Sequence, residues 1–221
     1  MATSRRNGLE RRDALLDAAL ACFIERGIVA TGIEDVRKAA GASPSSVYHL
    51  FDGLNQLVVA LLARTFERLL GHMTARVLAA DTAERAVRAL VESHLEWVTA
   101  HRDQARFMYQ AMALELAGPD RERLLQRKAE LKQPLLEHLG ANVARAAPGW
   151  PVVALELVLL GPSHEACRRW LAGGEVDLEW MRATLPELAW RSIAPPAPAQ
   201  PARPAPPRRR ARPRARITRS T

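Results

Sequence analysis

Apolar residues recur at helical spacing from about residue 9 to residue 193, and this pattern constrains the fold more than any other feature of the chain. Leu16, Ala19, Leu20 and Phe23, for example, occupy positions i, i+3, i+4 and i+7, which lie on one face of a helix. No stretch shows the strict alternation of apolar and polar residues that a half-buried strand requires. The sequence therefore predicts an all-α protein.

Capping residues and glycines divide this region into nine predicted helices. They cover residues 9–26, 32–40, 44–51, 54–79, 82–100, 103–117, 120–139, 151–172 and 177–192. The predicted N-caps include Asp81 or Thr82, Asp120 and Asp177. The predicted ends include Gly27, Gly41, Gly118, Gly140 and Gly173. Prolines are expected between helices or near their starts, and Pro162 is expected to kink or restart its helix.

The positive charge is concentrated at the C-terminal end of the sequence. The formal net charge is +8, but residues 194–221 contain eight arginines, eight of the fifteen prolines and no acidic residue. Residues 1–193 are formally neutral, with 24 basic and 24 acidic side chains. The tail has too few apolar residues to form a core and is expected to be disordered. It is either a neutral extension or a segment that attracts nucleic-acid phosphates without reading sequence.

The composition argues against several other classes of protein. Two cysteines exclude a disulfide scaffold and a multi-cysteine zinc site. Cys22 is expected in the core, whereas Cys167 is either buried or a redox sensor. The six histidines form no metal motif, and no catalytic constellation stands out, so no metal, cofactor or enzyme activity is expected. A charged N-terminus and the lack of an apolar run of about 18 residues predict a cytoplasmic protein without a membrane span.

Two short helices near the N-terminus are predicted to be joined by a tight turn. Thr31 and Glu34 have the spacing of a capping box at the start of the first helix. Gly41 supplies a residue that can adopt positive φ in the turn. Ser43 is a predicted N-cap, and Pro44 suits the first position of the second helix. This pattern is typical of a helix-turn-helix.

The second of these helices has one apolar and one polar face. The apolar face comprises Val47, Leu50, Phe51 and Leu54, which are expected to point into a small domain. The outer face comprises Ser45, Ser46, Tyr48, His49 and Asp52. Hydroxyl groups near a helix N-terminus suit contacts with phosphates and base edges in a major groove. The alternative is an ordinary helical hairpin with solvated serines.

From Leu15 to Leu57 the sequence resembles the N-terminal domain of the tetracycline-repressor-like (TetR) family. The similarity includes the turn, the Ser43-Pro44 start, the pair Tyr48 and His49, and Phe51. The resemblance implies a homodimeric, ligand-responsive transcriptional regulator. The implied organisation is a DNA-binding domain over 9–69 with its motif at 32–51, an effector-binding and dimerisation domain over 70–193, and the tail at 194–221.

The resemblance also implies specific contacts with double-stranded DNA. Thr31, Ser43, Tyr48 and His49 would contact phosphates or nearby bases, and Pro44, Ser45 and Ser46 would lie closest to base edges. Two positions depart from the family pattern: Leu54 replaces a usual phosphate-binding lysine, and Leu50 replaces an often polar residue. Residues 1–52 carry seven basic and seven acidic side chains. The missing phosphate attraction is therefore expected from Arg5, Arg6, Arg11 and Arg12, or from the C-terminal arginines.

Residues 54–192 are expected to hold a largely apolar small-molecule effector between helices. The candidate pocket residues are Phe66, Met73, His94, Trp97, His101, Met108, Tyr109 and Met112. His94, Trp97 and His101 form the expected mixed wall, which Phe66 and Met73 could face. The alternative is that these aromatic and methionine side chains are ordinary core residues.

The last two predicted helices, 151–172 and 177–192, are expected to form the dimer interface. Their apolar residues are Leu155, Val158, Leu159, Trp170, Leu171, Leu178, Met181, Leu185, Leu188 and Trp190. A twofold axis would place two recognition helices about 34–36 Å apart on a palindromic operator. Effector binding would shift the fourth predicted helix and spoil this spacing, with repression expected over activation. The rival interpretations are a non-specific architectural DNA-binding protein that uses the tail, and an all-helical enzyme.

Overall fold

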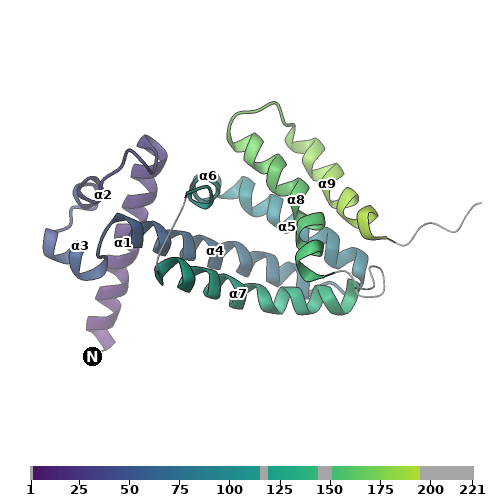
Figure 1. Ribbon diagram of the computed structural model, residues 1–221, viewed down its shortest axis with the longest axis horizontal. Helices are drawn as coiled ribbons and strands as arrows, with labels where there is room; N and C mark the ends of the chain where they lie inside the picture. Colours follow the sequence, from purple (N-terminus) through teal and green to yellow (C-terminus); the bar gives the residue numbers. More distant parts are fainter. Residues whose placement is uncertain (1, 115–118, 144–150, 195–221) are drawn as a thin grey trace, which may run out of the picture.

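The computed structural model describes residues 2–114, 119–143 and 151–194, which form helices and short connections with no strand (Figure 1). The predicted all-α class is therefore confirmed. The helices in these ranges are α1 (Ala2–Arg26), α2 (Ile33–Ala39), α3 (Pro44–Leu50), α4 (Leu54–Leu78), α5 (Ala83–Ala100), α6 (Arg102–Met112), α7 (Pro119–Val143), α8 (Val152–Leu171) and α9 (Leu178–Ile193).

The first three helices form a small head at one end of the molecule (Figure 1). Val36 from α2 and Val47 from α3 are completely buried together with Leu16 and Phe23 of α1. Their burial follows from the 3.6-residue period of their apolar positions. The helix α4 begins in this head and continues for 25 residues into the larger helical bundle. The expected domain boundary after residue 69 thus lies inside one continuous helix.

The larger bundle is built on α4 and α5. The helix α7 lies along α4, whereas α8 packs on α5 and α9 (Figure 1). The helix α6 lies between the bundle and the head, where the rings of Phe23 and Phe107 stack with their centroids 5.6 Å apart. The head is therefore connected to the bundle both through α4 and through the contact between α1 and α6.

Several predicted helix boundaries were wrong. The first helix begins at Ala2 rather than at residue 9, and α7 passes through Gly140 to Val143. A helical glycine costs about 1 kcal/mol relative to alanine, but the buried neighbours Leu139 and Val143 offset this cost. Asp120 lies in the first turn of α7 rather than at its N-cap. The helix α6 ends at Met112 rather than at residue 117, and Gly118 lies outside the described residues.

The prolines also differ from the expectation, because three of them lie inside described helices: Pro134 in α7, Pro162 in α8 and Pro186 in α9. The helix α8 does not restart at Pro162. Pro186 is itself buried, so its packing helps to offset the backbone hydrogen bond that its ring removes, whereas Pro134 and Pro162 are exposed.

Other predicted starts and ends of helices were correct. Thr82 caps α5 and Asp177 caps α9, each side chain accepting a hydrogen bond from a backbone N–H three residues later. Gly27, Gly41 and Gly173 follow their helices with positive φ. Within the described ranges, no single helix is long and apolar enough to cross a membrane; α3 and α4 pass such a test only together, with a bend of 62° between them.

Candidate nucleic-acid interface and ligand cavity

The turn between α2 and α3 is held by hydrogen bonds that the local sequence provides. The Ser46 N–H donates to Ser43 Oγ at 3.3 Å, and Pro44 occupies the first position of α3. Gly41 has φ +60°, which an L-residue with a side chain adopts only with strain. The Arg37 guanidinium donates to the Ala42 carbonyl at 3.1 Å and so joins α2 to the turn. The predicted helix-turn-helix is therefore present as a braced unit.

The start of α2 corrects the expectation for Thr31. Its hydroxyl donates to the Gly27 carbonyl at 2.8 Å, and the residue is only 3% exposed. The N-cap is Gly32, and the Gly32 N–H donates to the Asp35 carboxylate at 2.8 Å. The Thr31 hydroxyl is hydrogen-bonded to the end of α1. In the structure it therefore neither caps α2, as predicted, nor is free to contact a phosphate.

The outward face of α3 is polar and accessible. Ser45, Tyr48 and His49 are exposed, and the Tyr48 side chain retains 51% of its accessible surface. Ser43 and Pro44 are exposed beside them, whereas Ser46 is half-buried. Val47 and Phe51 lie on the opposite face in the core of the head. The structure thus places six of the seven predicted DNA-contact residues on α3 or at its N-cap.

Two arginines of α1 lie next to this unit. Arg11 lines a surface hollow together with Ser43 and Ser46. The Arg12 guanidinium lies over the Phe51 ring, 5.7 Å from its centroid. Leu54 packs partly buried against the core, as its apolar character requires. The basic groups in this part of the head are therefore on α1 and α2 rather than at the start of α4.

Residues 15–61, which span this unit, match the family described as bacterial regulatory proteins, tetR family. This N-terminal part of the chain is therefore a TetR-type domain. The HTH-type transcriptional repressor KstR2 of Rhodococcus jostii (strain RHA1) is 33% identical over 119 residues, which are 54% of this chain and 57% of the repressor. The chain spans about half the length of the curated relatives it matches.

Solved structures extend the similarity of fold over most of the chain. A TetR family transcription regulator from Marinobacter aquaeolei VT8 has a TM-score of 0.72 at 19% identity, covering 86% of this chain and 98% of that protein. The transcriptional regulator FadR from Bacillus subtilis, solved in complex with stearoyl-CoA, has a TM-score of 0.65 at 16% identity, covering 80% and 96%. These similarities show that the bundle also has the fold of TetR-family regulators.

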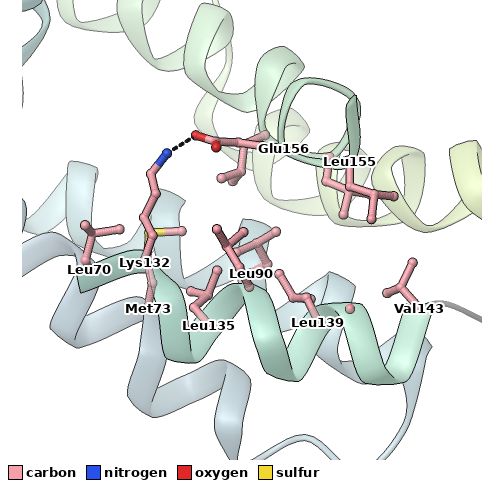
Figure 2. Close-up of a pocket in the computed structure, with 13 residues that line it drawn as sticks. Leu70, Met73, Leu90, Lys132, Leu135, Leu139, Val143, Leu155 and Glu156 are labelled. Carbon is pink, nitrogen blue, oxygen red and sulfur yellow. Dashed lines mark hydrogen bonds and ion pairs between the residues drawn. The ribbon is translucent and has the colours of Figure 1, made fainter. Parts of the chain in front are cut away.

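The helical bundle contains an apolar cavity of about 40 Å³ between α7 and α8 (Figure 2). Its wall is mainly leucine, with contributions from α4 and α5. The lining residues are Leu70, Met73, Leu90, Lys132, Leu135, Leu136, Leu139, Gly140, Val143, Leu155, Glu156, Leu159 and Leu160. Met73 is the one predicted pocket residue in this set. Sequence analysis missed α7 because its leucines are typical of any amphipathic helix.

The other predicted pocket residues are distributed over different environments. Phe66, Trp97 and Met108 are buried core residues. His101 is exposed and stacks on Trp97, with 4.9 Å between the ring centroids, and Met112 is 47% exposed. The expected wall of His94, Trp97 and His101 was therefore wrong, because the ends of α5 and α6 turn His101 and Met112 toward solvent.

His94 and Tyr109 instead belong to a buried polar cluster with His164 of α8. The Tyr109 hydroxyl lies 3.2 Å from His94 Nε2, and the rings of His94 and His164 stack 4.5 Å apart. Burial lowers the pKa of both histidines, that of His164 to about 4 with help from Lys128 and Lys132. Burial also raises the pKa of the adjacent Cys167 thiol to about 12, which argues against its role as a redox sensor.

Because His164 in this cluster has a lowered pKa, we expect the free energy of unfolding to fall in mild acid. Unfolded histidine has a pKa near 6.5, so below that pH the unfolded chain takes up protons that folded His164 does not bind until about pH 4. The free energy of unfolding should fall by up to about 3 kcal/mol from this group between pH 6.5 and 4. Urea unfolding of His164→Gln should show a shallower decline. The control His49→Gln, in an exposed side chain, should keep the original pH dependence; equal curves for both variants would contradict the prediction.

The helices α8 and α9 expose apolar side chains on the outside of the bundle. Val153 and Leu157 are 68% and 67% exposed and lie one turn apart on α8, and Trp180 and Leu188 of α9 are about half exposed. Among the residues predicted for an interface, Leu159, Leu171, Met181 and Leu185 are instead buried within the chain's own core. Of the predicted interface residues Leu188 is exposed, so the apolar surface available to a partner overlaps the predicted set only in part.

Proposed function

We propose that this protein is a sequence-specific DNA-binding repressor that acts as a homodimer and is released from a palindromic operator by a small, largely apolar molecule. The observation that carries this proposal is the exposed polar face of α3, with Ser45, Tyr48 and His49 held outward by the buried Val47 and Phe51. A short helix with hydroxyls at its start can enter a major groove and contact phosphates and base edges.

The proposed dimer joins α8 and α9 of one protomer to the same helices of a second. The exposed side chains Val153, Leu157, Trp180 and Leu188 give these helices an apolar surface, and packing on a twofold axis would bury it. The same axis would set the two α3 helices at half-site spacing. This role places the protein with DNA in the cytoplasm.

The effector site is proposed within the bundle, at the cavity between α7 and α8. The head would comprise residues 9–69 and the effector and dimerisation part residues 70–193. FadR from Bacillus subtilis was solved with stearoyl-CoA, a molecule with a long apolar chain, which favours a similarly apolar effector here. A regulator is preferred to an enzyme because the matched relative is a transcriptional repressor.

Selection of bound sequences from a random DNA library tests the proposal most directly. We expect one palindromic sequence whose half-sites are about one helical turn apart. Enrichment of no sequence, with binding to every duplex, would favour the rival architectural role instead.

The arginine-rich tail lies outside the described residues, but its role can be measured. Phosphate contacts by lysine or arginine release counterions, so each contact steepens the fall of log affinity with log salt by about 0.9. If the tail binds phosphates, deletion of residues 194–221 should reduce this slope by several units on any duplex. An unchanged slope would show that the tail does not bind phosphates. The phosphate attraction would then be assigned to arginines of α1 such as Arg11. A chain in which the tail arginines are replaced by glutamines serves as the length-matched control.

A further inference from the structure

The cavity between α7 and α8 has one charged feature, an ion pair between Lys132 of α7 and Glu156 of α8 (Figure 2). The other lining residues are apolar or glycine. The Lys132 side chain is 19% exposed, so its ammonium group is largely withdrawn from water. A charge in this position is expensive to leave without a partner. Whatever enters the cavity and separates the two helices therefore has to replace the carboxylate of Glu156.

The surroundings of this ion pair carry a surplus of positive charge. Lys128 lies one turn before Lys132, with its ammonium group 4.4 Å from the centroid of the Phe66 ring. Among the described residues, no carboxylate lies within ion-pair distance of Lys128. Burial and the two lysines keep His164 neutral at neutral pH by lowering its pKa. Beside the apolar cavity, Lys132 is thus paired with Glu156 while the ammonium group of Lys128 has no carboxylate at ion-pair distance among the described residues.

We propose that the effector is a carboxylic acid with an extended hydrocarbon body, whose carboxylate pairs with Lys132 in place of Glu156 while the hydrocarbon fills the leucine-lined cavity between α7 and α8. This inference rests on the proposed function, because it names the chemical class of that function's effector. Charge complementarity selects an anion, and the leucine wall selects an aliphatic or alicyclic body.

The size of the cavity gives the proposal a mechanical consequence. A volume of about 40 Å³ accommodates little more than a water molecule or two, whereas small-molecule sites usually span about 300–1,000 Å³. Binding therefore requires α7 and α8 to separate. The helix α8 is packed on α5 and α9, and α7 on α4, so the ion pair is the charged link that separation breaks.

Displacement of α7 would reach the DNA-binding head through contacts at its other end. The Arg127 guanidinium donates to the Glu67 carboxylate of α4 at 3.1 Å. Leu124, buried on α7, lines a surface hollow together with Leu50 and Phe51 at the end of α3. The helix α7 thus lines both the cavity and a hollow at the end of α3. This arrangement couples the carboxylate site to the position of α3.

Titration of the full chain with decanoate and with decan-1-ol by calorimetry tests the assignment, because the two probes share a chain length and differ in charge. We expect decanoate to bind at least tenfold more tightly than the alcohol. Lys132→Met should remove this preference, and Glu156→Gln should strengthen decanoate binding several-fold by removing the competing carboxylate. Equal binding of the two probes, binding of neither, or an unchanged preference in Lys132→Met would overturn the proposal. Tighter binding of decanoyl-CoA than of decanoate would also overturn it, since the thioester has no free carboxylate.

A second pair of variants keeps the test independent of the charged residues. Gly140 lines the cavity, and an added Cβ at this position would meet no atom within 4 Å. Gly140→Leu should therefore fill space and weaken decanoate binding at least tenfold, whereas the matched Gly140→Ala should bind like the original chain. Equal decanoate binding by both variants would contradict the proposed location of the effector in this cavity. None of these titrations contains DNA: their failure beside a successful operator selection would overturn only this inference, and failure of the selection would overturn the proposed function.

Discussion

Ser45→Glu is expected to lower operator affinity at least a hundredfold while leaving the folded protein as stable as before. Ser45 is exposed in the first turn of α3, where a carboxylate interacts favourably with the helix dipole by about 0.3–1 kcal/mol. The Ser45 hydroxyl lies 3.2 Å from Ser43 Oγ, but the hydrogen bond that caps the helix is donated to this oxygen by the Ser46 N–H, which the substitution keeps. When α3 lies in the major groove, the same carboxylate is repelled by the phosphates and by the acceptor atoms of the bases. A loss of about 1.4 kcal/mol in each protomer of a dimer is enough for a hundredfold effect.

The measurement is a fluorescence anisotropy titration with the duplex obtained by selection, together with a thermal melt. Ala75→Glu is the matched control, because Ala75 is exposed on α4 and the substitution adds the same charge away from α3. We expect the control to bind like the original chain. If both variants bind the operator equally well, α3 does not read the DNA.

The double substitution Val153→Asp with Leu157→Asp is expected to convert the dimer into monomers. Both side chains are more than 60% exposed in the isolated chain, so the substitutions remove little packing from the protomer. In the proposed interface, burial of each apolar side chain contributes about 1.5–3 kcal/mol, and the variant loses four of them while gaining buried carboxylates. The dimer dissociation constant should therefore rise by at least a thousandfold. Operator affinity should fall with it, since a monomer contacts one half-site.

Sedimentation equilibrium over a concentration series measures this change. Leu78→Asp with Leu125→Asp provides the control: both leucines are about half exposed, and they lie on α4 and α7, outside the proposed interface. This control should remain dimeric. A dimeric Val153→Asp, Leu157→Asp variant would assign dimerisation to another surface and remove the basis for half-site spacing.

The helix-turn-helix formed by α2 and α3 was largely predictable because the residues that determine it act locally. Ser43 and Pro44 define the start of α3, Gly41 defines the turn, and the spacing of Val47 and Phe51 defines the buried face; each acts within a few residues of backbone. Thr31 was misassigned because one hydroxyl can serve either of two helix ends. The packing of α1 against α2 determines that it donates to Gly27 rather than to the first turn of α2.

The effector region was less predictable because its contacts join distant segments. An amphipathic pattern indicates that α5, α7 and α8 each bury one face, but it does not indicate which faces meet. Lys132 and Glu156 are 24 residues apart, and neither residue is unusual in its own helix. His94 contacts His164 on another helix, whereas His101, at the C-cap of α5, points outward.

Helical class, the order of elements and the polar face of α3 follow from periodicity, caps and turn residues, because backbone hydrogen bonding and side-chain burial act at short range along the chain. The location of the cavity, the Lys132–Glu156 link and the apolar surface of α8 and α9 depend on how helices pack. Those features arise from complementary surfaces that meet only after the chain has folded, so no local pattern encodes them.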